Sequence, residues 1–347
     1  MRCAFRPRLV NGLFEDPVLF VDFAHQRRAL LFDLGDIGRL STKDLLKVSH
    51  VFVSHTHMDH FCGFDRLLRV RLGRPRQLWL CGPQGFLANL AGKLAGYRWD
   101  LVSSYSEALN IEAVEVHPGV LRRQRFACRR GFVPDQPPRE APFDGCLVAE
   151  PEFSVTAAVL QHSGPCLGFR FSERFHVNIL KPPLRALGLK VGPWINRFKA
   201  ALYAEAPADS PVTAVGDDGR QLNFRLADLA EALVRVTAGQ RIAYVTDAAD
   251  TRENREAIAA LIRGVDRLYI ETAFLRCDAA LARRRHHLTA ARAGTLAGQA
   301  GVRELYPMHF SPRYTQRPAL LMDEARQAFA AARGDPSPSP TMDSGAA

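Results

Sequence analysis

The chain has 347 residues and a formal net charge of +10, with 46 Lys and Arg against 36 Asp and Glu. A chain of this length can bury one large core or two modest ones. The positive charge favours an anionic partner such as RNA, although the positive residues are mostly arginines scattered along the chain, a bias that a GC-rich genome also produces. The charge alone therefore raises the expectation of RNA binding only modestly.

Two compositional features bear on location. The seven cysteines are dispersed and form no Cys-x-x-Cys pair, which argues for reduced thiols in a cytoplasm. No segment approaches the length of a membrane span, and the first twenty residues lack the continuous apolar core of a signal peptide. We therefore expect a cytoplasmic protein that does not enter a membrane.

In chain order, strand-like runs and helical stretches alternate. Residues 18–23, 29–32 and 48–53 are rich in apolar and β-branched residues, and residues 84–94 have a helical pattern. This alternation predicts an α/β fold, in which chemistry is placed at the carboxyl ends of the strands.

Four potential metal ligands follow the run 48–53 directly. They are His55, His57, Asp59 and His60, within six residues. Imidazoles and a carboxylate suit Zn²⁺ or a similar ion, and a loop at a strand end can aim alternate residues at one ion and their neighbours at a second. The alternative is a polar loop whose histidines cap the helix that follows.

Three later strand-like runs each end in one ligand-type residue. Residues 153–161 precede His162, residues 242–246 precede Asp247, and residues 305–308 precede His309. Taken singly, His162 and His309 could be hydrogen-bonded core histidines, and Asp247 could be a helix N-cap. Their order after the first motif favours metal binding.

The first motif, His-x-His-x-Asp-His, resembles the signature of hydrolases with the metallo-β-lactamase fold. The resemblance implies a four-layer αββα sandwich, two β-sheets face to face with helices outside, that holds two divalent metal ions at the sheet edge. By the same resemblance His55, His57 and His162 would hold one ion, Asp59, His60 and His309 the other, and Asp247 would bridge them. Such a pair, about 3.5–4 Å apart, can generate a hydroxide and clamp both oxygens of a phosphoryl displacement. Zn²⁺ is the expected metal, and the ligand types also accept Mn²⁺ or Fe²⁺.

From about residue 30 to residue 315, local motifs resemble ribonuclease Z, the endonuclease family that trims the 3′ side of precursor tRNA. Residues 63–69, 78–85 and 162–171 are similar to its Gly-Leu-x-x-Leu-Leu helix, its strand before Gly-Pro-x-Gly, and its third-motif region. The later matches are Glu271-Thr272-Ala273-Phe274, His287-Leu288-Thr289-Ala290 and His309-Phe310-Ser311-Pro312-Arg313-Tyr314. The resemblance implies a metal-dependent phosphodiester hydrolase acting on precursor tRNA, and family members are often homodimers.

Three residues acquire roles from this resemblance. His287 would protonate the departing ribose oxygen, work that suits a histidine with a pKa near neutrality. Asp59 would both bind metal and orient the attacking hydroxide, and Asp33, after the run 29–32, would support the histidine loop. The alternative for His287 is the solvated basic end of a helix that begins before residues 283–287.

The interval between His162 and Asp247 is where the family carries a flexible tRNA-gripping arm, and we expect an insertion here around residues 176–225 of a single domain, 1–333. Its basic residues alternate with Trp194 and Phe198, which could stack on bases. The alternative is a short helix that packs Trp194, Ile195 and Phe198 onto the core. The candidate substrate contacts are Lys181, Arg185, Lys190, Arg197 and Lys199, with Arg313 beyond the last metal motif.

Three further segments have distinctive amino-acid compositions. Residues 122–142, rich in Arg, Pro and Gln, predict an exposed insertion loop that could serve as a substrate lid. Residues 207–225 predict a turn or hairpin, and residues 334–347 predict a disordered tail.

Two other functions fit parts of the pattern. A relative that acts on a small substrate, such as a cyclic nucleotide or other phosphodiester, a lactone or a thioester, would use the same ligands without an arm. A catalytically inactive RNA-binding relative is disfavoured because every ligand position is filled.

Overall fold

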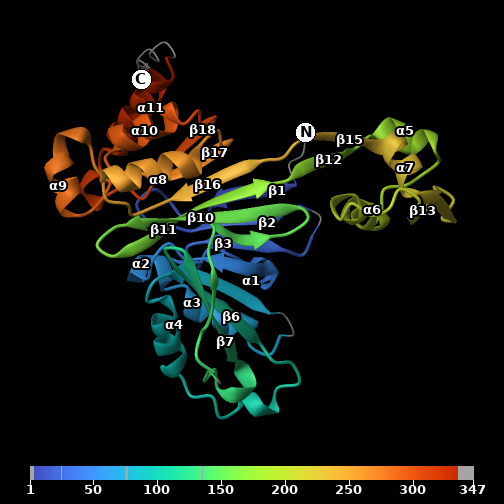
Figure 1. The fold of residues 1–347 in the computed structure, drawn as a ribbon, viewed down its shortest axis with the longest axis horizontal. Helices are drawn as coiled ribbons and strands as arrows, with labels where there is room; N and C mark the ends of the chain where they lie inside the picture. Colours follow the sequence, from blue (N-terminus) through green and yellow to red (C-terminus); the bar gives the residue numbers. More distant parts are fainter. Residues whose placement is uncertain (1–3, 25, 75–76, 135, 335–347) are drawn as a thin grey trace, which may run out of the picture. The chain divides into compact units, whose positions relative to one another are not determined.

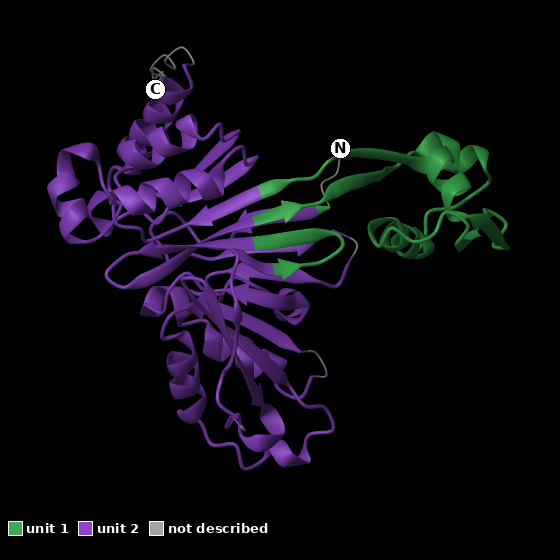
Figure 2. Cartoon of the chain, in the orientation of Figure 1, with its two compact units in different colours: residues 1–4, 148–155, 171–241 green, residues 5–147, 156–170, 242–347 purple. Residues whose placement is uncertain are grey.

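The computed structural model describes residues 4–24, 26–74, 77–134 and 136–334 (Figure 1). The chain divides into two compact units (Figure 2). The larger unit comprises residues 5–147, 156–170 and 242–347, and the smaller unit comprises residues 1–4, 148–155 and 171–241. The insertion expected at 176–225 falls within the stretch 171–241.

The first sheet has eight strands in the order of the chain, β1 to β8. The strands β3, β4, β5 and β6 run parallel to one another, so their carboxyl ends share one edge. The predicted strands at 18–23, 29–32 and 48–53 are confirmed to within one residue at either end. The bounds are β1 Phe5–Leu9, β2 Leu19–Phe23, β3 Ala29–Phe32, β4 Val48–Phe52, β5 Leu78–Pro83, β6 Asn110–His117, β7 Val120–Ala127 and β8 Arg139–Pro142.

The second sheet has six strands in the order β18-β17-β16-β11-β10-β9. The strands β16, β17 and β18 are parallel, which again gathers their carboxyl ends at one edge. The bounds are β9 Cys146–Ala149, β10 Phe153–Gln161, β11 Pro165–Glu173, β16 Arg241–Val245, β17 Arg267–Glu271 and β18 Glu304–Met308.

Aromatic rings join the two sheets in the larger unit. The ring of Phe169 on β11 lies 5.8 Å from Phe32 on β3 and 5.6 Å from Phe52 on β4, and Tyr244 on β16 lies 6.0 Å from Phe32. Because these rings have almost no exposed surface, they form an apolar layer between the sheets.

Helices cover the outer faces of both sheets in the larger unit (Figure 1). Leucines of α1, α3 and α4 pack on the first sheet, and apolar residues of α8 and α10 pack on the second. This arrangement confirms the predicted four-layer αββα sandwich. The bounds are α1 Thr42–Lys47, α2 Met58–Phe61, α3 Phe64–Arg71, α4 Phe86–Ala95, α8 Arg252–Ile262, α9 Ala279–Arg284, α10 Ala290–Gln299 and α11 Pro318–Arg333.

The prediction of an exposed loop over residues 122–142 is wrong. Most of the first half is strand β7, which pairs antiparallel with β6, and β8 then pairs with β7. Phe126 is buried while Arg123 and Arg125 are exposed, because a strand turns alternate side chains to opposite faces. The arginines of the solvent face gave this strand the composition of a loop.

The smaller unit has an apolar core of its own. Its elements include the antiparallel pair β12 and β15, the hairpin of β13 and β14, and three short helices; the hairpin confirms the prediction for 207–225. Trp194 and Phe198 on α6 are each 1% exposed and pack with Leu229 and Leu233 of α7. The bounds are β12 Phe175–Ile179, α5 Lys181–Ala186, α6 Trp194–Tyr203, β13 Pro211–Val215, β14 Gln221–Arg225, α7 Leu226–Leu233 and β15 Val234–Ala238.

This burial corrects one expectation. Trp194 donates its indole N–H to the carbonyl of Lys190 at 2.9 Å, and its ring has no surface on which a base could stack. The alternative, packing of the helix, describes Trp194 and Phe198 correctly, but the core they enter is that of the smaller unit.

Two absences concern the described part of the chain only. None of its helices combines the length and the apolar character that crossing a bilayer requires. Its six cysteines form no disulfide. The disordered tail predicted at 334–347 lies outside the described residues except for Gly334, which caps α11.

Candidate metal centre

Three site residues lie within two positions of a strand end and have left-handed backbones. The φ angles are +58° at Asp33 after β3, +47° at Asp247 after β16 and +55° at His309 after β18. This conformation is strained for most residues, but Asp and His adopt it more readily because their short polar side chains bond locally. The sharp turn ends each strand with its ligand-type side chain at the sheet edge, where strain commonly accompanies function.

One group of ligand atoms lies around Asp247. The side chains of His55, His57, His162 and Asp247 place one ligand atom each within 4.8 Å of the others. The Oδ2 atom of Asp247 lies 3.3 Å from Nε2 of His55 and 3.7 Å from Nε2 of His162. These are the residues that the resemblance assigns to one ion and its bridge.

A second group shares the same aspartate. Asp59, His60 and His309 also place ligand atoms within 4.8 Å of one another. Oδ2 of Asp247 lies 3.3 Å from Nε2 of His60, and its Oδ1 lies 3.0 Å from Nδ1 of His309. Asp247 therefore lies between both groups, with one carboxylate oxygen near His55 and His60 and the other near His309.

The donor set fits two cations. Among the described residues, Nε2 of His55, Nε2 of His60 and Nδ1 of His309 are buried without a hydrogen-bond partner of good geometry, a costly state unless another group binds them. Partial desolvation and the neighbouring His55 lower the pKa of the His57 imidazole, which favours the neutral form that a metal ligand needs. At His309 burial also opposes protonation, but Asp247 and Asp59 raise the pKa to about 10, so the site attracts positive charge.

The capping roles that the sequence left open are not seen at His57 or Asp247. His57 is the N-cap residue of α2, but its side chain makes no capping hydrogen bond. The helix after Asp247, α8, is capped by Thr251, whose hydroxyl accepts from the N–H of Asn254. The site residues are therefore free of the capping roles that the sequence left open.

Asp33 anchors the histidine loop. Its carboxylate accepts hydrogen bonds from the N–H of Ser54 at 2.6 Å, the hydroxyl of Ser54 at 2.8 Å and the hydroxyl of Tyr244 at 2.8 Å. Nδ1 of His60 lies 2.8 Å from the same carboxylate, which directs Nε2 toward Asp247. Sequence reasoning expected support from Asp33 and missed Tyr244, which lies 211 residues away along the chain.

The histidine loop also depends on two glycines, Gly35 and Gly63, which pack directly against backbone carbonyl groups. A Cβ atom on Gly63 would lie 2.2 Å from the carbonyl oxygen of Gly35, and one on Gly35 would lie 2.4 Å from the carbonyl oxygen of Asp59. These contacts are too short for any side chain, so glycine at both positions lets residues 34–35 pass beside the ligand loop. The N–H of Leu34 donates to the carbonyl of His60 at 2.9 Å across this contact.

His287 belongs to the centre and not to a solvated helix end. Helix α9 ends at Arg284, and the half-buried ring of His287 lies with Nδ1 2.7 Å from Oε2 of Glu271 and 3.8 Å from Oδ1 of Asp247. Burial opposes protonation, but the Glu271 carboxylate outweighs it and raises the pKa of His287. The ring can therefore hold a proton beside the ligand groups.

Glu271 is the residue whose role sequence reasoning missed. It has no exposed surface, ends strand β17, and accepts from the N–H of Ala248 at 2.6 Å and of Leu288 at 3.3 Å. Glu271 thus holds the turn after Asp247 and the residue after His287 together through these two hydrogen bonds. Its position at the end of a parallel strand, in the segment 271–274, was the signal that could have identified it.

The candidate substrate contacts lie in both units. Lys181, Arg185, Lys190 and Arg197 are exposed on the smaller unit, and Lys199 is half-buried, with burial lowering the pKa of its amine. In the larger unit, Arg313 follows the His309 turn and lies 3.5 Å from the carboxylate of Asp278. None of the six is among the residues that place ligand atoms in the centre.

Comparison with known proteins finds curated relatives that share one name. The chain is 34% identical over 327 residues to the ribonuclease Z of Deinococcus radiodurans, covering 92% of this chain and 94% of the relative. It is 38% identical over 297 residues to the ribonuclease Z of Thermobifida fusca, covering 82% and 76%. The solved metallo-β-lactamase fold protein YhfI from Bacillus subtilis matches 94% of each chain with a TM-score of 0.53 and 16% identity, a likeness of fold. No protein-family model matches the chain.

The four-layer sandwich is a metallo-β-lactamase fold, and the paired His and Asp groups at its strand ends, together with the curated relatives, define a metal-dependent hydrolase. Within that class, the extent and identity of the match to its curated relatives place the chain plainly: it belongs to the ribonuclease Z family.

Proposed function

We propose that this enzyme cleaves the 3′ side of precursor tRNA with two divalent metal ions. The observation that carries the proposal is the convergence of six ligand-type side chains, from the loop after β4 and the ends of β10 and β18, on one carboxylate, Asp247. The alternative, hydrolysis of a small phosphodiester, lactone or thioester, is not favoured, because the curated relatives over most of this chain are ribonucleases Z.

The ligand assignment follows the two groups. His55, His57 and His162 would hold one ion, Asp59, His60 and His309 would hold the other, and Asp247 would bind both. When bound, two such ions supply an activated water and offset the charge of the phosphoryl oxygens. Zn²⁺ is the proposed metal because histidine and aspartate suit it, and Mn²⁺ or Fe²⁺ are the alternatives.

Two residues of the chain would act on protons. His287 would hold a proton on its outward ring nitrogen, Nε2, and deliver it to the departing ribose oxygen, because Nδ1 faces the Glu271 carboxylate. Asp59, with 44% of its side chain exposed, would orient the attacking oxygen toward phosphorus. The exposure of Asp59 and the burial of Asp247 fit these different roles.

The smaller unit would contact the body of the tRNA. Its exposed basic residues, Lys181, Arg185, Lys190 and Arg197, would bind phosphates without reading sequence, and Arg313 would do so beside the centre. We propose that the enzyme works in the cytoplasm, together with its substrate, and that it assembles as a homodimer.

The first test compares cleavage of a 3′-extended precursor tRNA with hydrolysis of bis(p-nitrophenyl) phosphate. Wild type should cut at the tRNA 3′ junction, Asp59→Ala should lose both activities, and His287→Ala should cut the RNA at least about 100-fold more slowly. Hydrolysis of the small diester alone would overturn the tRNA proposal and leave a metallophosphodiesterase.

A second test isolates the smaller unit. Ile179 pairs with Val234, and the N–H of Leu180 donates to the carbonyl of Leu233 at 2.8 Å. Replacing residues 180–233 with Asn-Gly should therefore close β12 and β15 into a hairpin. The shortened enzyme should retain hydrolysis of the small diester and bind precursor tRNA at least tenfold more weakly; unchanged tRNA binding would contradict the role of the smaller unit.

A further inference from the structure

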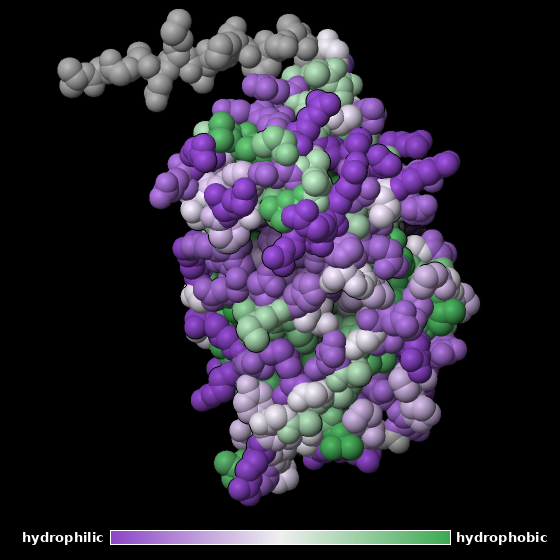
Figure 3. Space-filling view, turned by 90° about the vertical axis from the view of Figure 1, so that its left-hand side faces the viewer, coloured by the Kyte–Doolittle hydropathy of each residue, from purple (hydrophilic) through white to green (hydrophobic). Residues whose placement is uncertain are grey.

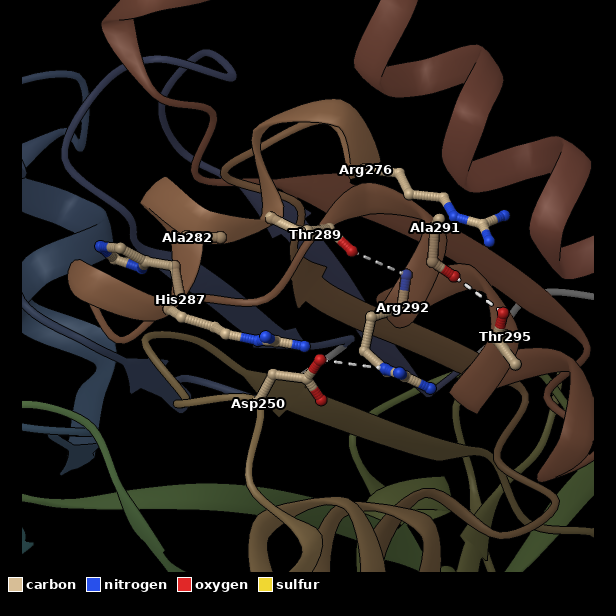
Figure 4. Close-up of a pocket in the computed structure, with 10 residues that line it drawn as sticks. Asp250, Arg276, Ala282, His287, Thr289, Ala291, Arg292 and Thr295 are labelled. Atoms are coloured by element: carbon tan, nitrogen blue, oxygen red, sulfur yellow. Dashed lines mark hydrogen bonds and ion pairs between the residues drawn. The ribbon is translucent and has the colours of Figure 1, made fainter.

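A pocket of about 340 Å³ opens beside His287 in the larger unit. Figure 4 shows His287, Asp250, Arg292 and Arg276 around it, and Arg283 also lines it. The pocket lies between the turn after β16, the segment through α9, and the start of α10. Its volume lies within the range of small-ligand sites. Because the pocket lies next to His287, the proposed proton donor, it lies close to the bond that would be cleaved.

The lining is strongly cationic. The lining residues include three arginines, Arg276, Arg283 and Arg292, and one carboxylate, Asp250. Asp250 is already paired, with Arg292 at 3.1 Å and with Arg255 at 3.6 Å. Within the described part of the chain, the guanidinium groups of Arg276 and Arg283 have neither a hydrogen-bond nor an ion-pair partner. The residues that line the pocket therefore carry more positive than negative charge.

The start of helix α10 does not account for this pocket as an anion site. Its first three amide groups are already used: Ala290 donates to the carbonyl of Phe274 at 2.7 Å, Ala291 to the Glu324 carboxylate at 3.1 Å, and Arg292 to the Thr289 hydroxyl at 3.2 Å. An anion in the pocket would therefore be bound by side chains, above all by Arg276 and Arg283.

The surface around the pocket suits a polyanion. Figure 3 shows the face of the molecule that includes α9, and hydrophilic residues cover most of it. Arg283, Arg284 and Arg285 are all exposed at the end of α9. An extended nucleic-acid strand could reach the pocket across this face without displacing an apolar surface.

We propose that this pocket binds the phosphate on the far side of the departing ribose, one nucleotide away from the bond that is cleaved. The inference rests on the proposed function, in which His287 protonates that ribose oxygen. Because His287 lines the pocket, the nucleotide that leaves lies at its mouth, and the next phosphate of the same strand is the anion closest to Arg276 and Arg283. Guanidinium groups bind phosphate oxygens in pairs, which positions the strand without reading its bases.

The test uses precursor tRNA in which one uncharged methylphosphonate replaces the phosphate on the far side of the departing ribose. A second substrate carries the methylphosphonate four linkages further from the cut, as a position control. Both are compared with the natural RNA for wild type, for the double variant Arg276→Gln/Arg283→Gln, and for Arg98→Gln, an exposed arginine that follows α4.

The proposal predicts a specific pattern of kcat/KM. For wild type the adjacent methylphosphonate should reduce kcat/KM by roughly tenfold or more, the usual effect of losing a charge-assisted hydrogen bond, and the distant one should not. The double variant should lose a similar factor on natural RNA, and the adjacent methylphosphonate should then cost nothing further. Arg98→Gln should behave as wild type.

Two results would overturn the inference: an equal methylphosphonate penalty in wild type and the double variant, or no penalty at the adjacent position in wild type. An unfolding midpoint equal to that of wild type shows that the double variant is folded. Failure of the proposed function is separable, because wild type would then leave even the natural precursor tRNA uncut.

Discussion

The Nδ1 atom of His287 lies 2.7 Å from Oε2 of Glu271, a carboxylate with no exposed surface at the end of β17. The other carboxylate oxygen, Oε1, accepts the N–H of Ala248, the residue after Asp247. One buried side chain thus orients the proposed proton donor and also supports the turn that holds the bridging aspartate. Glu271 is a positioning residue, since it acts through both neighbours.

Replacing Glu271 with glutamine tests this role. The amide oxygen can still accept from Ala248, but an NH₂ group then faces His287 and the charge that stabilises its protonated ring is lost. We expect kcat on precursor tRNA to fall about 10–100-fold, with KM nearly unchanged. Because the two residues act as one unit, the double variant with His287→Ala should be no slower than His287→Ala alone. Additive losses, measured in single-turnover assays, would contradict the pairing.

Asp33 offers a second prediction, with its own matched control. Asp33→Ala removes the acceptor of four hydrogen bonds, to Ser54 (two), His60 and Tyr244, and should weaken metal binding about 10–100-fold. Asp33→Asn keeps the size and tolerates the left-handed backbone at φ +58°, so it should lose less affinity than Asp33→Ala. Competition with a chelator measures both, and equal affinities for wild type and Asp33→Ala would count against the anchoring role.

Gly63 tests the close approach beneath the ligand loop. Gly63→Ala would place Cβ 2.2 Å from the carbonyl oxygen of Gly35, and the displacement should reduce the free energy of unfolding by about 1–3 kcal/mol. The control is Gly92→Ala within α4, where a Cβ meets nothing within 4 Å; it should stabilise the protein by roughly 0.5–1 kcal/mol. Denaturant titration should give shifts of opposite sign, and shifts of the same sign would contradict the steric explanation.

Trp194 tests whether the smaller unit depends on its own core. Trp194→Ala should destabilise that unit by about 3–5 kcal/mol, because the indole is 1% exposed among the apolar residues of α6 and α7. Val191→Ala, at a residue 69% exposed in the same unit, is the control and should change nothing. Hydrogen exchange measures the effect by region: protection should fall in residues 181–233 for Trp194→Ala only, and global loss of protection would contradict a separate core.

Much of this site was predictable because its signals are local. His55, His57, Asp59 and His60 follow a buried strand within six residues, and His162, Asp247 and His309 each end a strand-like run. Parallel strands bring such ends to one edge of a sheet. The order of these residues along the chain was therefore enough to predict that their side chains lie close together. The strand β7 was missed for an equally local reason, since alternating exposed arginines conceal a half-buried strand.

The sequence by itself determined the fold class, the residue types at the centre and their order, because hydrophobic periodicity and ligand chemistry act over a few neighbouring residues. Only the tertiary structure decided which partner each side chain meets. It brought Tyr244 to Asp33 and Glu271 to His287, buried Trp194 in a separate core, and collected Arg276, Arg283 and Arg292 around one pocket. These contacts join residues up to 211 positions apart, and they depend on the packing of two sheets and their helices, which no local pattern encodes.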